Sequence, residues 1–130
     1  MSADLLKAAT QAMANAYAPY SDFPVGAAVR GSNGKIYAGC NIENASYPEG
    51  WCAETSALSH MVSDGERLAT EILVIAEKKP RTTPCGGCRQ RLSEFAGRDV
   101  HVHLCDGSGI VETITLGDLL PKSFDLESAS

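Results

Sequence analysis

The sequence predicts an α/β protein, a three-layer α/β/α sandwich with a central five-stranded mixed sheet, in a single domain that spans residues 1–130. Apolar residues recur at helical spacing in three stretches, at 2–17, 52–62 and 85–96. Five short segments of strand character separate or follow them, at 23–29, 35–40, 72–76, 100–105 and 110–114. With 130 residues, 44% of them hydrophobic, one core can bury about two-thirds of the unfolded surface.

A helix and a hairpin are expected at the start of the chain. Ser2 can cap a first helix that ends before Pro19. The apolar stripe of this helix consists of Leu5, Leu6, Ala9, Met13, Ala16 and Tyr17. The strands at 23–29 and 35–40 are joined through Ser32-Asn33-Gly34, and Asn-Gly tolerates the positive φ of a tight turn.

The rest of the chain alternates helices with strands. One helix is expected to begin at Cys52, and another at Cys85, directly after Pro84. Between them, the continuous apolar run 72–76 is typical of a strand covered on both faces. The strands 100–105 and 110–114 follow, then a short helix at 116–120. The tail after about residue 124 is expected to be loosely held.

Three cysteines have the spacing of a metal site. Cys52 stands alone, and Cys85 and Cys88 form a C-x-x-C pair, with both groups at expected helix starts. Free backbone N–H groups and the positive dipole end favour thiolate there. A structural zinc normally has four protein ligands, so three leave a position for water, whose pKa the metal lowers to about 7. Glu54, two residues after Cys52, is then the natural proton carrier.

Other interpretations of these residue types remain open. A C-x-x-C pair alone could be a redox pair or half of a structural zinc ribbon, although a second such pair is missing. Cys40 and Cys105 stand singly and are interpreted as small buried hydrophobes. The three histidines are expected to be structural or surface residues rather than ligands: His60, His101 and His103.

Charge and composition limit the classes of partner. The formal net charge is −5, and no run of lysine and arginine exists that could follow a phosphate backbone, so a small molecule is favoured over a nucleic acid. No apolar stretch approaches the length of a membrane span, and the N-terminus lacks the pattern of a signal peptide. With an odd number of cysteines at metal-like spacing, we expect a cytoplasmic protein.

Cys52-Ala53-Glu54, followed by the run 84–90 (P-C-G-G-C-R-Q), resembles the zinc-dependent cytidine deaminases of the short, homotetrameric three-cysteine type. The segments 18–21, 39–45 and 119–121 resemble the same family. The resemblance implies one Zn²⁺ per chain, held by the three cysteines, and hydrolytic deamination of cytidine and deoxycytidine to uridine and deoxyuridine with release of ammonia. It also implies a homotetramer whose active sites are completed by neighbouring subunits.

The substrate residues depend more strongly on this resemblance. Asn41 and Glu43, two apart on an extended chain, point to the same side and suit a pair of sugar hydroxyls, although a solvated loop is the alternative. The resemblance implies that both bind the ribose and that Phe23, otherwise ordinary core, contacts the pyrimidine. It further assigns the backbone N–H of Ala53 to the ring carbonyl. Two residues match those that neighbouring subunits contribute to each other's sites: Tyr47 and Phe124.

One position departs from the family pattern. Many three-cysteine members have arginine directly after the glutamate of C-A-E, where this chain has Thr55. We expect helix N-termini and thiolate hydrogen bonds, including one from the Thr55 hydroxyl, to compensate for the missing charge, with Arg89 near in sequence. Three competing functions remain open: deamination of another base, nucleoside or nucleoside-like antibiotic; deamination of a polynucleotide, which usually shows His-Ala-Glu and a basic surface; and a noncatalytic zinc module.

Overall fold

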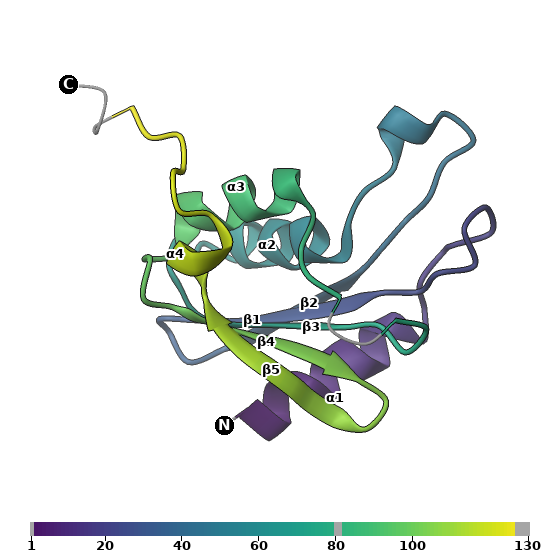
Figure 1. Cartoon of the computed structure of the whole chain (residues 1–130), viewed down its shortest axis with the longest axis horizontal. Coiled ribbons are helices and arrows are strands. Elements are labelled where there is room, and N and C mark those ends of the chain that lie inside the picture. Colours follow the sequence, from purple (N-terminus) through teal and green to yellow (C-terminus); the bar gives the residue numbers. More distant parts are fainter. Residues whose placement is uncertain (1, 80–81, 127–130) are drawn as a thin grey trace.

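The structure, a computed structural model, describes residues 2–79 and 82–126 and has the expected three layers, with a mixed sheet between helices (Figure 1). The elements in chain order are α1 (Ser2–Met13), β1 (Gly26–Gly31), β2 (Ile36–Cys40), a 3₁₀ turn (Tyr47–Glu49), α2 (Ala53–Ser63), β3 (Ala69–Ile75), α3 (Gly86–Phe95), β4 (His101–Asp106), β5 (Gly109–Thr115) and α4 (Leu116–Leu119). The five strands lie in the order β2-β1-β3-β4-β5. The predicted fold class is confirmed.

The strand directions decide where the helices begin. β1 pairs antiparallel with both β2 and β3, so β2 and β3 run in the same direction. β4 pairs parallel with β3, and β5 returns antiparallel as an edge strand. Therefore α2, which follows β2, and α3, which follows β3, both start from the carboxyl-end edge of the sheet.

Two apolar clusters fill the space on either side of the sheet. Helices α2 and α3 lie over one face, where Ala57, Met61 and Leu92 pack on Val29 and Ile72. Helix α1 covers the other face, where its apolar side chains pack on β1, β2 and β3, with Cys105 of β4 in the same cluster (Figure 1). The continuous apolar run 72–76 is buried on both faces, as its composition predicts.

The first helix is shorter than its apolar stripe predicts. It ends at Met13, and i→i+3 hydrogen bonds tighten the next turn. The expected stripe member Tyr17 instead donates its N–H to the carbonyl of Asn41 and forms a bridge with Ile42. Ser2 was also expected to be the N-cap, but it lies within the helix and donates its hydroxyl to Glu71 Oε2 at 3.0 Å. Both differences arise from contacts with residues distant in sequence.

The hairpin agrees with its turn signal but begins later. Gly34 has φ +84°, the conformation that Asn-Gly favours. β1 starts at Gly26 rather than at residue 23, because the Asn41 side chain bonds the backbone of Phe23 and Val25 in place of a strand partner.

The end of the described chain is partly held. Gln90 Nε2 donates to the carbonyl of Phe124 at 2.9 Å, and Gln90 Oε1 accepts from the N–H of Phe124 at 3.1 Å. Phe124 is therefore held, and the loose tail expected after it, of which residues 127–130 lie outside the described part, stays a prediction. Over the described residues, no helix has both the length and the apolar character needed to cross a membrane.

Candidate functional site

The three predicted cysteine ligands meet at the starts of two helices. Cys52 is the N-cap of α2, and Cys85 is the N-cap of α3, where its sulfur accepts a hydrogen bond from the N–H of Cys88. Cys88, one turn into α3, is fully buried. All three Sγ atoms lie within 4.8 Å of one another. Residues 33 positions apart are thus brought together because both helices begin at the same edge of the sheet.

The donor set fits zinc. Tetrahedral Zn–S bonds of about 2.3 Å place two sulfurs about 3.8 Å apart. The Cys52 and Cys85 Sγ atoms are 3.8 Å apart. Cys52 is half-buried and Cys85 exposed, so one side of the cluster faces solvent and a substrate can approach it. Three soft donors with one open side match a catalytic rather than a structural zinc site.

Ionisation of the thiols is uneven. A hydrogen bond from the Cys88 thiol holds the pKa of Cys52 below its ordinary value. The same pairing, together with burial, raises the pKa of Cys88. Burial thus works against the thiolate form of Cys88, and a divalent cation at the cluster would favour that form.

Glu54 lies next to this cluster in the first turn of α2. Its side chain is only 5% exposed, and burial raises the pKa of its carboxyl group. A hydrogen bond from its own backbone N–H, in the first turn of the helix, and the charge of Arg91 act in the opposite direction. A buried carboxyl group with a raised pKa holds a proton more readily than an exposed one, which suits a general acid–base catalyst that must both accept and release it.

Thr55 makes the thiolate contact expected of it, but the neighbouring cation is a different arginine. Thr55 Oγ1 lies 3.5 Å from Cys88 Sγ. Arg91 Nη1 donates to Thr55 Oγ1 at 3.1 Å and lies 3.9 Å from Cys88 Sγ. Arg89, which the sequence suggested, turns to the carbonyls of Pro84 and Leu119. Arg91 could have been found from its i,i+3 spacing to Cys88, which places both on one face of α3.

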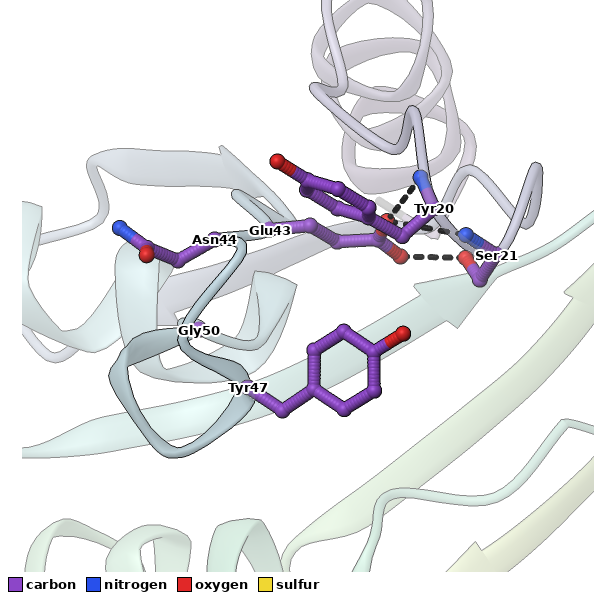
Figure 2. A pocket seen from close by; sticks show the side chains of 6 residues that line it. All are labelled: Tyr20, Ser21, Glu43, Asn44, Tyr47 and Gly50. Carbon is purple, nitrogen blue, oxygen red and sulfur yellow. Dashed lines mark hydrogen bonds between the residues drawn. The ribbon is translucent and has the colours of Figure 1, made fainter.

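A pocket of about 340 Å³ lies beside the segment that leads into Cys52. Figure 2 shows its lining residues: Tyr20, Ser21, Glu43, Asn44, Tyr47 and Gly50. The Glu43 carboxylate turns toward the N–H groups of Tyr20 and Ser21 and the Ser21 hydroxyl, while Asn44 points away from it (Figure 2). The Ser21 hydroxyl is the main reason that the pKa of Glu43 lies below its ordinary value. The carboxylate is therefore ionised and fixed in place at neutral pH.

Asn41 and Glu43 both reach the segment 20–25, in agreement with their expected common side. Asn41 Oδ1 accepts from the N–H of Val25 at 2.9 Å, and its Nδ2 donates to the carbonyl of Phe23 at 3.0 Å. Each side chain keeps unused capacity, because an amide has two donors and two lone pairs and a carboxylate about four lone-pair sites. The pair thus holds the segment that carries the half-buried Phe23 and can still bind a ligand.

Two of the implied residues are widely exposed. Tyr47 is 76% exposed and Phe124 70% exposed, although the Tyr47 ring meets that of Tyr20 edge-on at a centroid distance of 6.2 Å. Ala53, by contrast, is buried as the first residue of α2, where backbone N–H groups lack intrahelical partners.

The remaining cysteines and histidines lie away from the cluster. Cys105 is fully buried, as expected, whereas Cys40 is only half-buried because it ends the edge strand β2. His103 is buried between Glu71 and Thr113, with ring nitrogens 2.7 Å and 2.8 Å from their oxygens. His60 and His101 lie at the surface. Cys105 and the three histidines therefore agree with their interpretation from the sequence, whereas Cys40 is less buried than expected.

Comparison of the sequence with known proteins identifies a family that it matches. The profile of the cytidine and deoxycytidylate deaminase zinc-binding region matches residues 2–104. A cytidine deaminase of Sporosarcina psychrophila is 42% identical over 97% of this chain and 93% of its own length. One of Halalkalibacterium halodurans is 44% identical over 95% of this chain and 93% of its own.

Solved structures show the same likeness in three dimensions. A cytidine deaminase from Burkholderia pseudomallei superposes with a TM-score of 0.90 at 41% identity, covering 95% of this chain and 99% of that one. The cytidine deaminase from Mycobacterium tuberculosis superposes with a TM-score of 0.82 at 37% identity, covering 95% and 97% respectively. The likeness in fold and in sequence therefore covers nearly the whole length of this chain and of each of the two solved structures.

Proposed function

Since the chain belongs to the cytidine and deoxycytidylate deaminase family, we propose that Cys52, Cys85 and Cys88 hold a zinc ion and that Glu54 carries the protons in the hydrolytic deamination of cytidine and deoxycytidine. Zinc-dependent deamination of cytidine is the activity that the full-length relatives and the metal-binding cluster indicate. The products are uridine or deoxyuridine and ammonia, a step of pyrimidine salvage.

The observation that carries this function is a buried carboxyl group one residue inside the helix that Cys52 caps. When bound, zinc acts as a Lewis acid that lowers the pKa of a water molecule to about 7. Glu54 would accept the proton that this water loses and deliver it to the ring nitrogen of the cytosine as the oxygen adds to the ring carbon that bears the amino group. The carboxylate would then take the second proton, from the added hydroxyl, and give it to the amino group, so that the carbon–nitrogen bond breaks and ammonia leaves. Burial supports this role, because it raises the pKa of the carboxyl group above its ordinary value and so helps it to hold the proton between the two transfers.

The nucleoside is held by residues at the same edge of the sheet. The spare hydrogen-bonding capacity of Asn41 and Glu43 serves two ribose hydroxyls, and Phe23, on the segment that these side chains fix, contacts the pyrimidine ring. The N–H of Ala53 binds the ring carbonyl from the helix N-terminus, where the macrodipole favours negative charge. The substrate is a free nucleoside, in keeping with a net charge of −5.

The proposal includes a homotetramer with shared active sites. Tyr47 lies on the segment that leads into Cys52, and Phe124 is held by Gln90 of α3. Both side chains are large and exposed, and they are the residues that we assign to neighbouring subunits. Size-exclusion chromatography with light scattering tests this assignment, and a monomer would contradict it. All five cysteines are free thiols, which suits the reducing cytoplasm in which we place the protein.

Turnover of four candidate substrates tests the reaction. Ammonia release is measured with cytidine, deoxycytidine, cytosine and adenosine for the zinc-loaded protein, for Glu54→Gln, and for Glu94→Gln, an exposed glutamate of α3. We expect turnover of the two cytosine nucleosides, a loss of about 10²- to 10⁴-fold in Glu54→Gln, and no loss in Glu94→Gln. Zinc should remain at one per chain in all three. Undiminished turnover in Glu54→Gln would exclude its assigned role.

A further inference from the structure

The arginine contact at the cysteine cluster has no role in the reaction described above. Arg91 extends from α3 one turn after Cys88 and folds back, so that Nη1 reaches Thr55 Oγ1 at 3.1 Å and Cys88 Sγ at 3.9 Å. Its Cζ lies 5.5 Å from the centre of the Trp51 ring, next to Cys52 in the chain. An exposed arginine is thus fixed between the two helix starts by partners from both.

The hydrogen bonds at Thr55 have one consistent direction. A guanidinium can only donate, so Thr55 Oγ1 accepts from Arg91. The single hydroxyl proton is then free to point at Cys88 Sγ, 3.5 Å away. The three groups form a chain in which the positive charge of Arg91 polarises the hydroxyl and strengthens its bond to the sulfur.

The excess negative charge of the zinc-loaded cluster explains why this series of hydrogen bonds is needed. Three thiolates around a divalent ion leave one negative charge in excess, and the Glu54 carboxylate can add a second when ionised. Cys88 is the most deeply buried of the three sulfurs, so its negative charge is solvated least. A guanidinium is permanently charged at any working pH, and Arg89 is engaged with loop carbonyls instead.

We infer that Arg91, acting through the Thr55 hydroxyl, is the residue that orients the Cys88 thiolate and offsets the excess negative charge of the zinc-loaded cluster. Arg91 is a positioning residue, because it contacts the proposed zinc ligand Cys88 and has no assigned contact with the substrate. This inference rests on the proposed zinc site. It specifies that the positive charge comes from Arg91, on the face of α3 that carries Cys88. The hydroxyl of Thr55 on α2 transmits the effect of this charge to the sulfur.

The first test measures zinc affinity by competition with a chromogenic chelator, without any turnover. The variants are Arg91→Met, Arg91→Lys, Thr55→Val and Thr55→Ser, with Lys7→Met on α1 as the control that removes one exposed positive charge from the opposite layer. We expect zinc to bind about tenfold more weakly in Arg91→Met and Thr55→Val. Arg91→Lys and Thr55→Ser should recover part of the loss, and Lys7→Met should equal the wild type.

The second test reads the sulfur directly. With Co²⁺ in place of zinc, the sulfur-to-cobalt charge-transfer band reports how strongly the thiolates are stabilised. Removing a hydrogen bond to Cys88 raises the energy of its electrons, so the band should move to longer wavelength in Arg91→Met and in Thr55→Val. The double variant should show a shift smaller than the sum of the two, because both act on one sulfur through one chain.

The outcomes separate this inference from the proposed function. Unchanged zinc affinity and an unchanged cobalt spectrum in Arg91→Met would overturn the inference, even if the variant melts at a lower temperature. Additive shifts in the double variant would overturn the relay through Thr55. Wild-type protein that binds no zinc at the three cysteines would instead refute the zinc site itself, and wild-type protein that binds zinc without deaminating a nucleoside would refute the proposed reaction alone.

Discussion

Gly39 controls how closely α2, with Cys52 at its start, lies against the sheet. A Cβ added at Gly39 would stand 2.5 Å from the backbone nitrogen of Ala57 and 2.6 Å from Ser56 Cβ. Ordinary contact begins at 3.4 Å, so the nearest atom is 0.9 Å too close. Because that atom belongs to helix backbone, Gly39→Ala must move α2 as a body by about 1 Å.

Such a displacement should act on the site more than on the fold. Overpacking lowers the free energy of unfolding by about 1–3 kcal/mol. For a domain of this size, each kcal/mol lowers Tm by roughly 3–5 °C. A misplacement of about 1 Å at reacting groups costs on the order of 100-fold in rate. We therefore expect kcat/KM for cytidine to fall about 100-fold in Gly39→Ala, with weaker zinc binding because Cys52 moves with the helix.

Gly26 supplies a matched control on the opposite face. A Cβ there would stand 2.1 Å from the carbonyl oxygen of Ala9 and 2.8 Å from Met13 Cβ, so Gly26→Ala pushes α1 away from the sheet. The overlap is larger, and the loss of Tm should be at least as great as in Gly39→Ala. Activity per folded molecule should nevertheless stay within about threefold of wild type, because α1 carries none of the proposed site residues.

The assay compares both variants at one protein concentration and at a temperature at which each remains folded by circular dichroism. The expected result is a reversal of order, in which the variant with the larger loss of Tm keeps more activity. Equal losses of kcat/KM in the two variants would refute the reasoning, because they would show that general loosening, and not the position of α2, limits the reaction.

Three further perturbations have defined outcomes. Leu92→Ala should lower stability by about 2–5 kcal/mol, because Leu92 is fully buried on the inner face of α3, whereas replacing the exposed Glu94 by alanine should change it by less than about 0.5 kcal/mol; chemical denaturation measures both. Burial raises the pKa of Glu71, but hydrogen bonds from His103 and Ser2 outweigh it and leave this pKa below 4.5. The resulting stability is present above pH 4.5 and lost as the pH falls through the lower folded value, so wild type should lose more Tm than Glu71→Gln between pH 7 and pH 4. Removing zinc with a chelator should lower Tm and re-added zinc should restore it, since a ligand that binds only the folded state stabilises it; an unchanged Tm would count against the cysteine site.

Local patterns predicted the sheet well, because its signals are short-range. The apolar run 72–76 identified a strand buried on both faces, and Asn33-Gly34 marked the turn that Gly34 makes with positive φ. The end of α1 could not be predicted in the same way. Its apolar spacing continues to Tyr17, and only the carbonyl of Asn41, far along the chain, takes the Tyr17 N–H out of the helix.

The candidate site shows the same division. The spacing of Cys52, Cys85 and Cys88 predicted one metal site, because three cysteines supply soft donors and leave a position open for water, and their Sγ atoms lie within 4.8 Å of one another. Arg89 was noted as a cation near in sequence, but one residue along a helix is about 100° of rotation, and Arg89 faces the carbonyls of Pro84 and Leu119. Arg91, three residues after Cys88, faces the thiolates. Helix direction, rather than sequence distance, decides which charge reaches the cluster.

The strand order explains why this site can exist without a nearby arginine on α2. β2, β3 and β4 run in one direction, so α2 and α3 both begin at one edge of the sheet, and each brings roughly half a positive charge to the cluster. Asn41 follows β2 directly and falls at the same edge. These dipoles belong to the backbone, so they do not depend on which side chains the helices carry. The arginine that adds a full positive charge can stand on either α2 or α3, because both helices begin at the cluster. The position after Glu54 is therefore free to hold threonine, provided that the other helix supplies the charge from Arg91.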